Sequence, residues 1–83
     1  MLAIIKMLIT FHKSMSKIES KKLGKNMRRI RVEKGMSQGD ICRALKLDRA
    51  HVSNIENGKQ NPTLDTIAKI AKALGVTSDQ LLK

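Results

Sequence analysis

The segment from Ser37 to Gly58 constrains the fold of this chain most, because it predicts two short helices joined by a sharp bend. Ser37 with Asp40 three residues later is typical of a helix N-terminus, where both side chains bond amides that the first turn leaves free. Asp48 can cap the second helix, and Gly58 can end it in the left-handed conformation. Only residues 46–47 separate the helices. Helix, tight turn, helix is the arrangement that places a second helix in the DNA major groove.

The second helix of this segment has two contrasting faces. At 100° per residue, Val52 and Ile55 fall on one face, with Glu56 in the same arc. The opposite face carries small and hydrogen-bonding side chains, which suit close approach to base edges, and an arginine at its flank can reach guanine. For any one of these residues taken alone, a solvated polar face is the alternative. The residues predicted to read bases are Arg49, Ala50, Ser53 and Asn54.

Charge points to a polyanionic partner. The chain carries a net charge of +10, and residues 20–59 hold eleven Lys or Arg against four Asp or Glu, whereas residues 60–83 hold three against two. The positive charge therefore accompanies the two-helix motif, which favours double-stranded DNA and an affinity that falls steeply with salt. Gln38, Asn57 and Lys59 are predicted to bind phosphates and fix the register on the duplex.

Over about residues 23 to 82 the chain resembles the Cro/repressor-type (XRE) helix-turn-helix domain. The resemblance is carried by Gln38, Ile41, Cys42, Asp48, Val52, Ser53, the run Ile55-Glu56-Asn57-Gly58-Lys59, Pro62 and the run from Ala73 to Val76. It implies an all-α, compact five-helix lambda-repressor-like domain and a small repressor or controller. Two residues depart from the family pattern. Lys46 replaces the usual turn glycine, which costs about 1 kcal/mol for a positive φ, and Cys42 replaces a small alanine.

A helix is predicted to precede the motif, over residues 20–34. Leu23, Met27 and Ile30 fall at i, i+4 and i+7, which indicates one buried stripe, and Gly35 then ends the helix.

Two more helices are predicted after the motif, making five in all. Thr63 can cap the first of them after Pro62, and Gly75 can end it. Thr77 with Gln80 forms a capping box for the last. Along the longer helix, the side chains predicted to face the core are Leu64, Ile67, Ala68, Ala71 and Leu74.

Glu56 is expected to face the core, where an unpaired carboxylate costs several kcal/mol. Arg31 flanks the buried stripe of the first helix. We therefore predict an Arg31–Glu56 ion pair that ties the first helix to the back of the second motif helix, as the resemblance also implies. The alternative is that Glu56 extends to solvent.

Residues 1–19 are treated as an N-terminal extension to a helix-turn-helix domain spanning 20–83. The apolar run from Leu2 to Phe11 is broken by Lys6, is too short to span a membrane and is a poor signal peptide. Three interpretations stay open: translation that begins at Met15, an arm that pairs two subunits, and a membrane role, which the run supports least.

Other chemistry finds little support in the sequence. The two histidines lie in different segments, and Cys42 with His51 lacks the spacing and the third ligand of a metal site. We expect no enzyme activity, metal, cofactor or small-molecule ligand, and the single cysteine fits a reducing, cytoplasmic location. Because one domain makes few base contacts, we predict a homodimer on palindromic operators, formed through Leu81 and Leu82 or through the N-terminal arm. The alternative for the two leucines is that they pack back on their own domain. The alternative is an adaptor or antitoxin-like module that binds another protein with the same fold.

Overall fold

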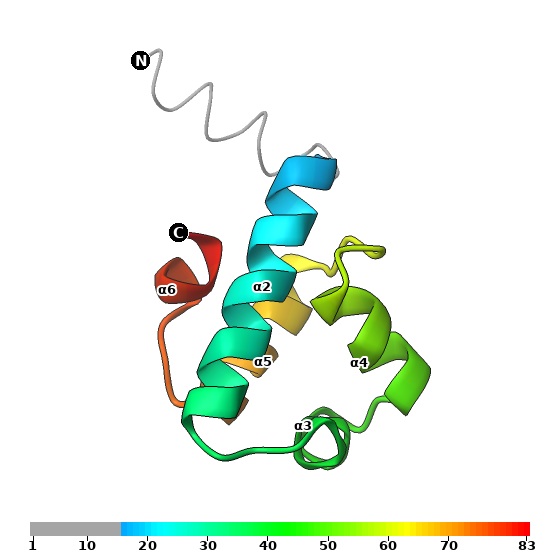
Figure 1. Ribbon diagram of the computed structural model, residues 1–83, viewed down its shortest axis with the longest axis vertical. Coiled ribbons are helices and arrows are strands. Elements are labelled where there is room, and N and C mark those ends of the chain that lie inside the picture. The colour runs from blue at the N-terminus through cyan, green and yellow to red at the C-terminus, as the bar shows by residue number, and fades with distance from the viewer. Residues whose placement is uncertain (1–15) are drawn as a thin grey trace.

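A computed structural model describes residues 16–83 as five α-helices with no strand among them (Figure 1). The helices are α2 (Lys17–Glu33), α3 (Gln38–Leu45), α4 (Arg49–Glu56), α5 (Leu64–Leu74) and α6 (Ser78–Leu82). In Figure 1, α2 runs through the middle of the view, with α6 on one side and α4 on the other. The predicted all-α fold is confirmed. The N-terminal arm considered above falls outside the described residues.

Each helix begins after a Ser, Thr or Asp whose side chain accepts a hydrogen bond from the amide three residues later. The predicted capping boxes of α3 and α6 are both present. The start of α2 differs from the prediction: the helix begins at Lys17 instead of residue 20, because the Ser16 hydroxyl accepts a hydrogen bond from the Glu19 amide at 3.2 Å.

Left-handed residues end the two motif helices. Lys46 terminates α3 with φ 55° and ψ 41°, as the resemblance implies for the position of the usual turn glycine. Gly58, with φ 71°, follows α4, and its amide donates to the carbonyl of Ile55 at 3.1 Å. The turn therefore keeps the predicted geometry although a lysine occupies its left-handed position, at a cost of about 1 kcal/mol.

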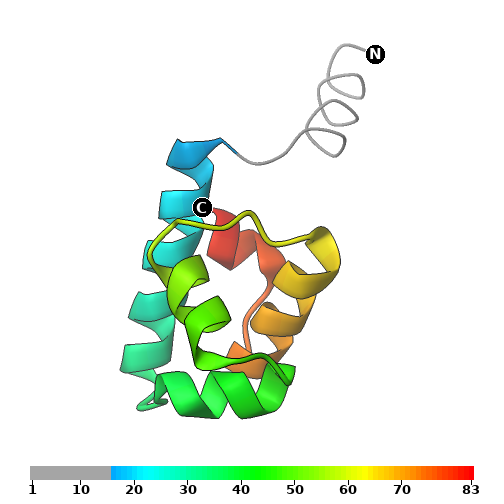
Figure 2. The ribbon, with the colours of Figure 1, turned by 90° about the vertical axis from the view of Figure 1, so that its right-hand side faces the viewer.

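The core is aliphatic and lies between α2 and the other helices. α2 packs against α4, α6 and α5, while α3 packs against α4 and α5. Figure 2 shows α2 and α4 side by side, with α3 crossing at one end. The buried apolar side chains are Leu23, Met27, Ile30, Ile41, Val52, Ile55, Ile67, Ile70, Ala71, Leu74 and Leu81.

Helix α5 is rotated slightly from the predicted orientation. Ile70, which was not predicted to be buried, is fully enclosed, whereas Ala68 is exposed and Leu64 is 53% exposed. The buried stripe runs through Ile67, Ile70, Ala71 and Leu74, at i, i+3, i+4 and i+7. Ala68 lies about 100° around the helix from Ile67 and so faces away from the core. Leu64 is the first residue of α5, and its side chain is exposed at that end of the helix.

The terminal helix corrects another prediction. Leu81 is 0% exposed and belongs to the core of its own chain, so it is not available to a second subunit. Leu82 is 43% exposed. Asn26 on α2 donates to the backbone carbonyl of Leu81 at 2.8 Å, which fastens the end of the chain to α2.

Helix α2 approaches the C-terminal end of α4 very closely. A Cβ atom added at Gly24 would lie 2.4 Å from the carbonyl oxygen of Glu56 and 2.5 Å from that of Ile55. One turn earlier, the buried hydroxyl of Ser20 donates to the side-chain oxygen of Asn61, in the loop that follows α4. These contacts hold α4 at a fixed distance and angle from α2.

Candidate nucleic-acid interface

Helices α3 and α4 form a helix-turn-helix unit whose second helix presents one face outward. Asp48 caps α4 by accepting a hydrogen bond from the His51 amide at 2.7 Å. Val52 and Ile55 are 0% exposed and anchor the helix from behind, as predicted. The sequence of α4 therefore separates an anchoring face from an open one.

The four residues predicted to read bases all lie on the open side of α4. Arg49 and Ala50 are exposed, and Ser53 and Asn54 are half-buried. None of the four is enclosed in the core, so their side chains are accessible to a partner. Their contact with bases remains a prediction.

The three residues predicted to bind phosphate lie in different surroundings. Asn57 and Lys59 are exposed just beyond α4, where the side-chain amide of Asn57 donates to the Ser53 hydroxyl at 3.3 Å. Gln38 is half-buried at the start of α3, and its side-chain amide donates to Oε1 of Glu56 at 3.1 Å. The side chain of Gln38 is thus engaged within the domain.

Glu56 is the centre of a buried polar network joining α2, α3 and α4. The expected ion pair is present: Nε of Arg31 donates to Oε2 at 2.8 Å, and a terminal guanidinium nitrogen donates to Oε1 at 3.2 Å. The other terminal nitrogen of Arg31 donates to the carbonyl of Met36 at 2.9 Å. The Glu56 and Arg31 side chains are 2% and 12% exposed. These bonds tie α2 to α4 and to the segment before α3, and the bond from Gln38 ties α3 to α4.

Sequence reasoning found two members of this network and missed two. The Arg31–Glu56 pair follows from helix faces and charge. The bond from Gln38 depends on how α3 crosses α4, and the one to Met36 depends on the path of the chain between α2 and α3. No periodicity in the sequence encodes either of these.

The capping box of α3 perturbs one titratable group. The backbone amide and the hydroxyl of Ser37 stabilise the charged form of Asp40, with help from Arg43, and so hold the pKa of its carboxyl below the ordinary value. The ionised form of Asp40 therefore stabilises the start of α3.

Residues 16–83 contain no group of three or more His, Cys, Asp or Glu placed to hold a metal ion. None of the described helices has the length and apolarity needed to cross a membrane. Cys42 is half-buried and packs against the core, as the prediction for a small hydrophobe had it.

Comparison with known proteins relates this geometry to a family. The helix-turn-helix family model HTH_3 matches residues 27–81. A hypothetical transcription factor from Neisseria meningitidis serogroup B is 48% identical over 60 residues, which cover 72% of this chain and 57% of that protein. The chain thus spans little more than half the length of that relative.

Two solved structures share the fold at similar sequence identity. The restriction-modification controller protein C.AhdI from Aeromonas hydrophila is 34% identical, with a TM-score of 0.73 over 77% of this chain and 97% of that one. The controller protein C.Esp1396I, solved as a tetramer with its natural 35 base-pair operator, is 32% identical, with a TM-score of 0.65 over 77% and 95%. The chain belongs to the HTH_3 helix-turn-helix family, the Cro/repressor-type (XRE) family that its motif resembles.

Proposed function

We propose that this protein is a cytoplasmic, sequence-specific regulator of transcription that binds double-stranded DNA, of the small repressor or controller type. The observation that carries the proposal is α4 itself. Its apolar residues and Glu56 are buried, and its polar and small residues stand open on the other face. The relative C.Esp1396I was solved on its operator, which supports DNA as the partner. Proteins that share a fold can have different functions, so the proposal depends on the side chains on the open face of α4.

The open face of α4 supplies the base contacts in this proposal. Arg49 donates two hydrogen bonds to a guanine edge, and Asn54 pairs with an adenine edge. Ser53 and Ala50 are small enough to let the helix approach, with the alanine methyl suited to a thymine methyl. Each well-placed pair is worth about 1–3 kcal/mol of discrimination against the wrong base.

Phosphate contacts come from the ends of the motif helices. Asn57 and Lys59 are exposed beyond α4 and bind the backbone of one strand. Gln38 binds a phosphate through its backbone amide at the first position of α3, because its side-chain amide is directed to Glu56.

A homodimer on a palindromic operator completes the proposal. One copy of α4 offers few base contacts, and two copies bound one DNA turn apart, about 34–36 Å, double them. The tetrameric operator complex of C.Esp1396I supports assembly on DNA. Of the two leucines predicted at the interface, only Leu82 is accessible, since Leu81 lies in the core.

Selection of bound sequences from random duplex DNA, at two salt concentrations, tests the proposal. We expect a palindromic site whose base preference relaxes at defined positions when Arg49 becomes Ala. Lys59→Ala should weaken binding to all sequences alike and lower the salt dependence by about one phosphate contact. Equal loss across all sequences for Arg49→Ala would show that Arg49 does not read bases. Failure of the wild type to retain any duplex at low salt would favour the protein-binding adaptor.

A further inference from the structure

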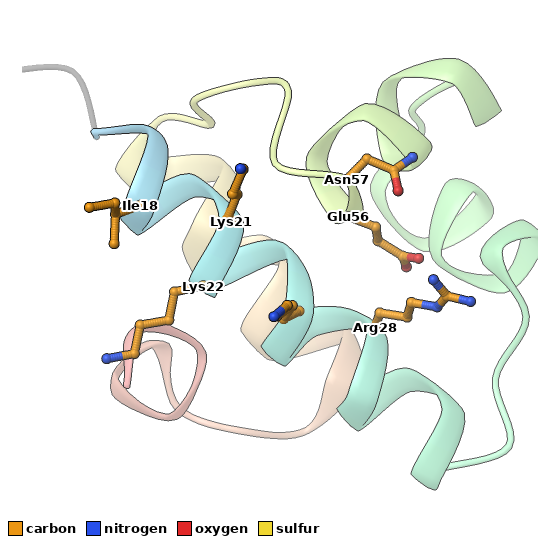
Figure 3. A pocket seen from close by; sticks show the side chains of 7 residues that line it. Ile18, Lys21, Lys22, Arg28, Glu56 and Asn57 are labelled. Atoms are coloured by element: carbon orange, nitrogen blue, oxygen red, sulfur yellow. The ribbon is translucent and has the colours of Figure 1, made fainter.

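Helix α2 carries a row of cations that the proposed reading face does not use. Lys21, Lys25 and Arg28 lie at i, i+4 and i+7, with Lys22 beside them, and all four are exposed. They line an open groove that runs along α2 and reaches the C-terminal end of α4 (Figure 3). Ile18, near the start of α2, and Asn57, just after α4, also line it.

The four cations are free of ion pairs within the domain. The ion pairs among residues 16–83 involve other basic residues, namely Arg29, Arg31, Arg43, Lys69 and Lys83. Glu56 also borders the groove, but its carboxylate is paired with Arg31 and accepts a hydrogen bond from Gln38. Because seven residues of helix rise about 10 Å, four uncompensated charges lie within about that length. Such a row attracts a polyanion strongly.

The groove is continuous with the proposed phosphate contacts. Asn57 is the C-cap of α4 and also lines the groove, and in Figure 3 Arg28 points toward Glu56, the residue before Asn57. A phosphodiester strand held at Asn57 therefore has Arg28 and Lys21 next in its path. The groove from Ile18 to Arg28 follows about 15 Å of helix axis, which corresponds to about four base-pair steps at 3.4 Å each.

We infer that this basic groove binds the phosphodiester backbone of operator DNA outside the base pairs read by α4, which extends the footprint of each subunit. The inference rests on the proposed function. Lysine suits this task because its ammonium is a mobile point charge that follows a strand without fixing its sequence. The groove would thus add affinity and salt dependence while adding no base preference.

Duplex length provides the first test. The wild-type chain is titrated with the selected operator alone and with the same operator extended by about six base pairs of unrelated sequence at each end. We expect tighter binding and a steeper salt dependence on the longer duplex. Equal affinity and equal salt slope on the two duplexes would overturn the inference. Because that result still requires binding to the short duplex, it differs from failure of the proposed function, in which the short duplex is not bound.

Charge removal provides the second test. The triple variant Lys22→Gln, Lys25→Gln and Arg28→Gln should lose the gain from the longer duplex. The slope of the logarithm of the affinity against the logarithm of the salt concentration should become shallower by up to about 2.7, which is about 0.9 for each of three lost phosphate contacts. The affinity at about 0.15 M salt should fall about fivefold for each lost contact. Lys21 is retained because its backbone and side chain pack against Gly58.

A matched variant controls for net charge. Changing Lys69, Lys72 and Lys83 to Gln removes the same charge from the exposed surface of α5 and the chain end. This control should keep the preference for the longer duplex. If both triple variants lose it equally, the effect belongs to net charge and the groove is not a backbone site.

Discussion

At Gly24 a single methyl group should disturb the packing of α2 against α4. Substitution by alanine places a Cβ atom 2.4 Å and 2.5 Å from the carbonyl oxygens of Glu56 and Ile55, and 2.8 Å from the carbonyl carbon of Glu56. All three atoms belong to the backbone, so no side chain can rotate away. Helix α4 must instead move away from α2 by at least about 0.6 Å, since Cβ contacts below 3.0 Å are essentially never seen.

The expected cost follows from two opposing effects. Overpacking of a well-packed site costs about 1–3 kcal/mol, and the upper end applies because the obstruction is backbone. Alanine is favoured over glycine inside a helix by about 1 kcal/mol. The net loss is therefore about 2 kcal/mol, a large part of the roughly 3–10 kcal/mol expected for a domain of about 70 residues. At this size the melting temperature should fall by about 8–16 °C.

Thermal and urea unfolding followed by far-ultraviolet circular dichroism measure this loss, since the chain contains no tryptophan. Gly39→Ala is the matched control. The same methyl group there would lie 3.4 Å from an Arg43 nitrogen and 3.5 Å from the Ser37 hydroxyl, both on side chains. The control should stay within about 1 kcal/mol of the wild type. If Gly24→Ala melts at or above the wild-type temperature, the close approach of α2 and α4 is wrong.

Three further predictions concern stability. Glu56→Ala should lower the free energy of unfolding by about 3–5 kcal/mol, because it leaves the largely buried Arg31 guanidinium without a carboxylate partner. Glu56→Gln should cost less, and no loss in either variant would contradict the network. Asp40 has a lowered pKa in the folded state, so its stabilisation is present near neutral pH and is lost as the pH falls through that value. The difference in melting temperature between wild type and Asp40→Asn should accordingly shrink on acidification, and a constant difference would refute this. Leu81→Ala should cost about 2–5 kcal/mol in urea unfolding and Leu82→Ala far less, whereas equal losses would contradict their different burial.

Local chemistry made much of this fold predictable. The capping residues of α3, α4, α5 and α6 could be identified because a hydroxyl or carboxylate near a helix start has one strong use, to bond the free amides of the first turn. The sharp bend at residues 46–47 followed from the short connection, and the left-handed conformation of Lys46 followed from the resemblance, which has a glycine at this position. On α4, the wheel separated anchoring from open residues because Val52 and Ile55 are flanked by polar neighbours.

Features that depend on how helices meet were harder to predict. Helix α5 has apolar residues around more than half of its circumference, so its spacing did not decide between Ile70 and Ala68 for the core. The bond from Gln38 to Glu56 and the contact at Gly24 arise from the crossing of particular helices. A glycine inside a helix permits close packing, but the sequence does not show which other helix approaches it. The roles of the site residues in DNA binding stay predictions.

The central claim is that the open face of α4 reads base pairs, and Asn54 tests it most directly. The free energy of binding should be measured for wild type and Asn54→Ala on the selected operator and on operators with one base pair changed. We expect Asn54→Ala to lose about 1–3 kcal/mol on the selected operator and almost nothing on the operator whose Asn54-contacted pair has been replaced. Equal losses on every operator would contradict base reading by this helix.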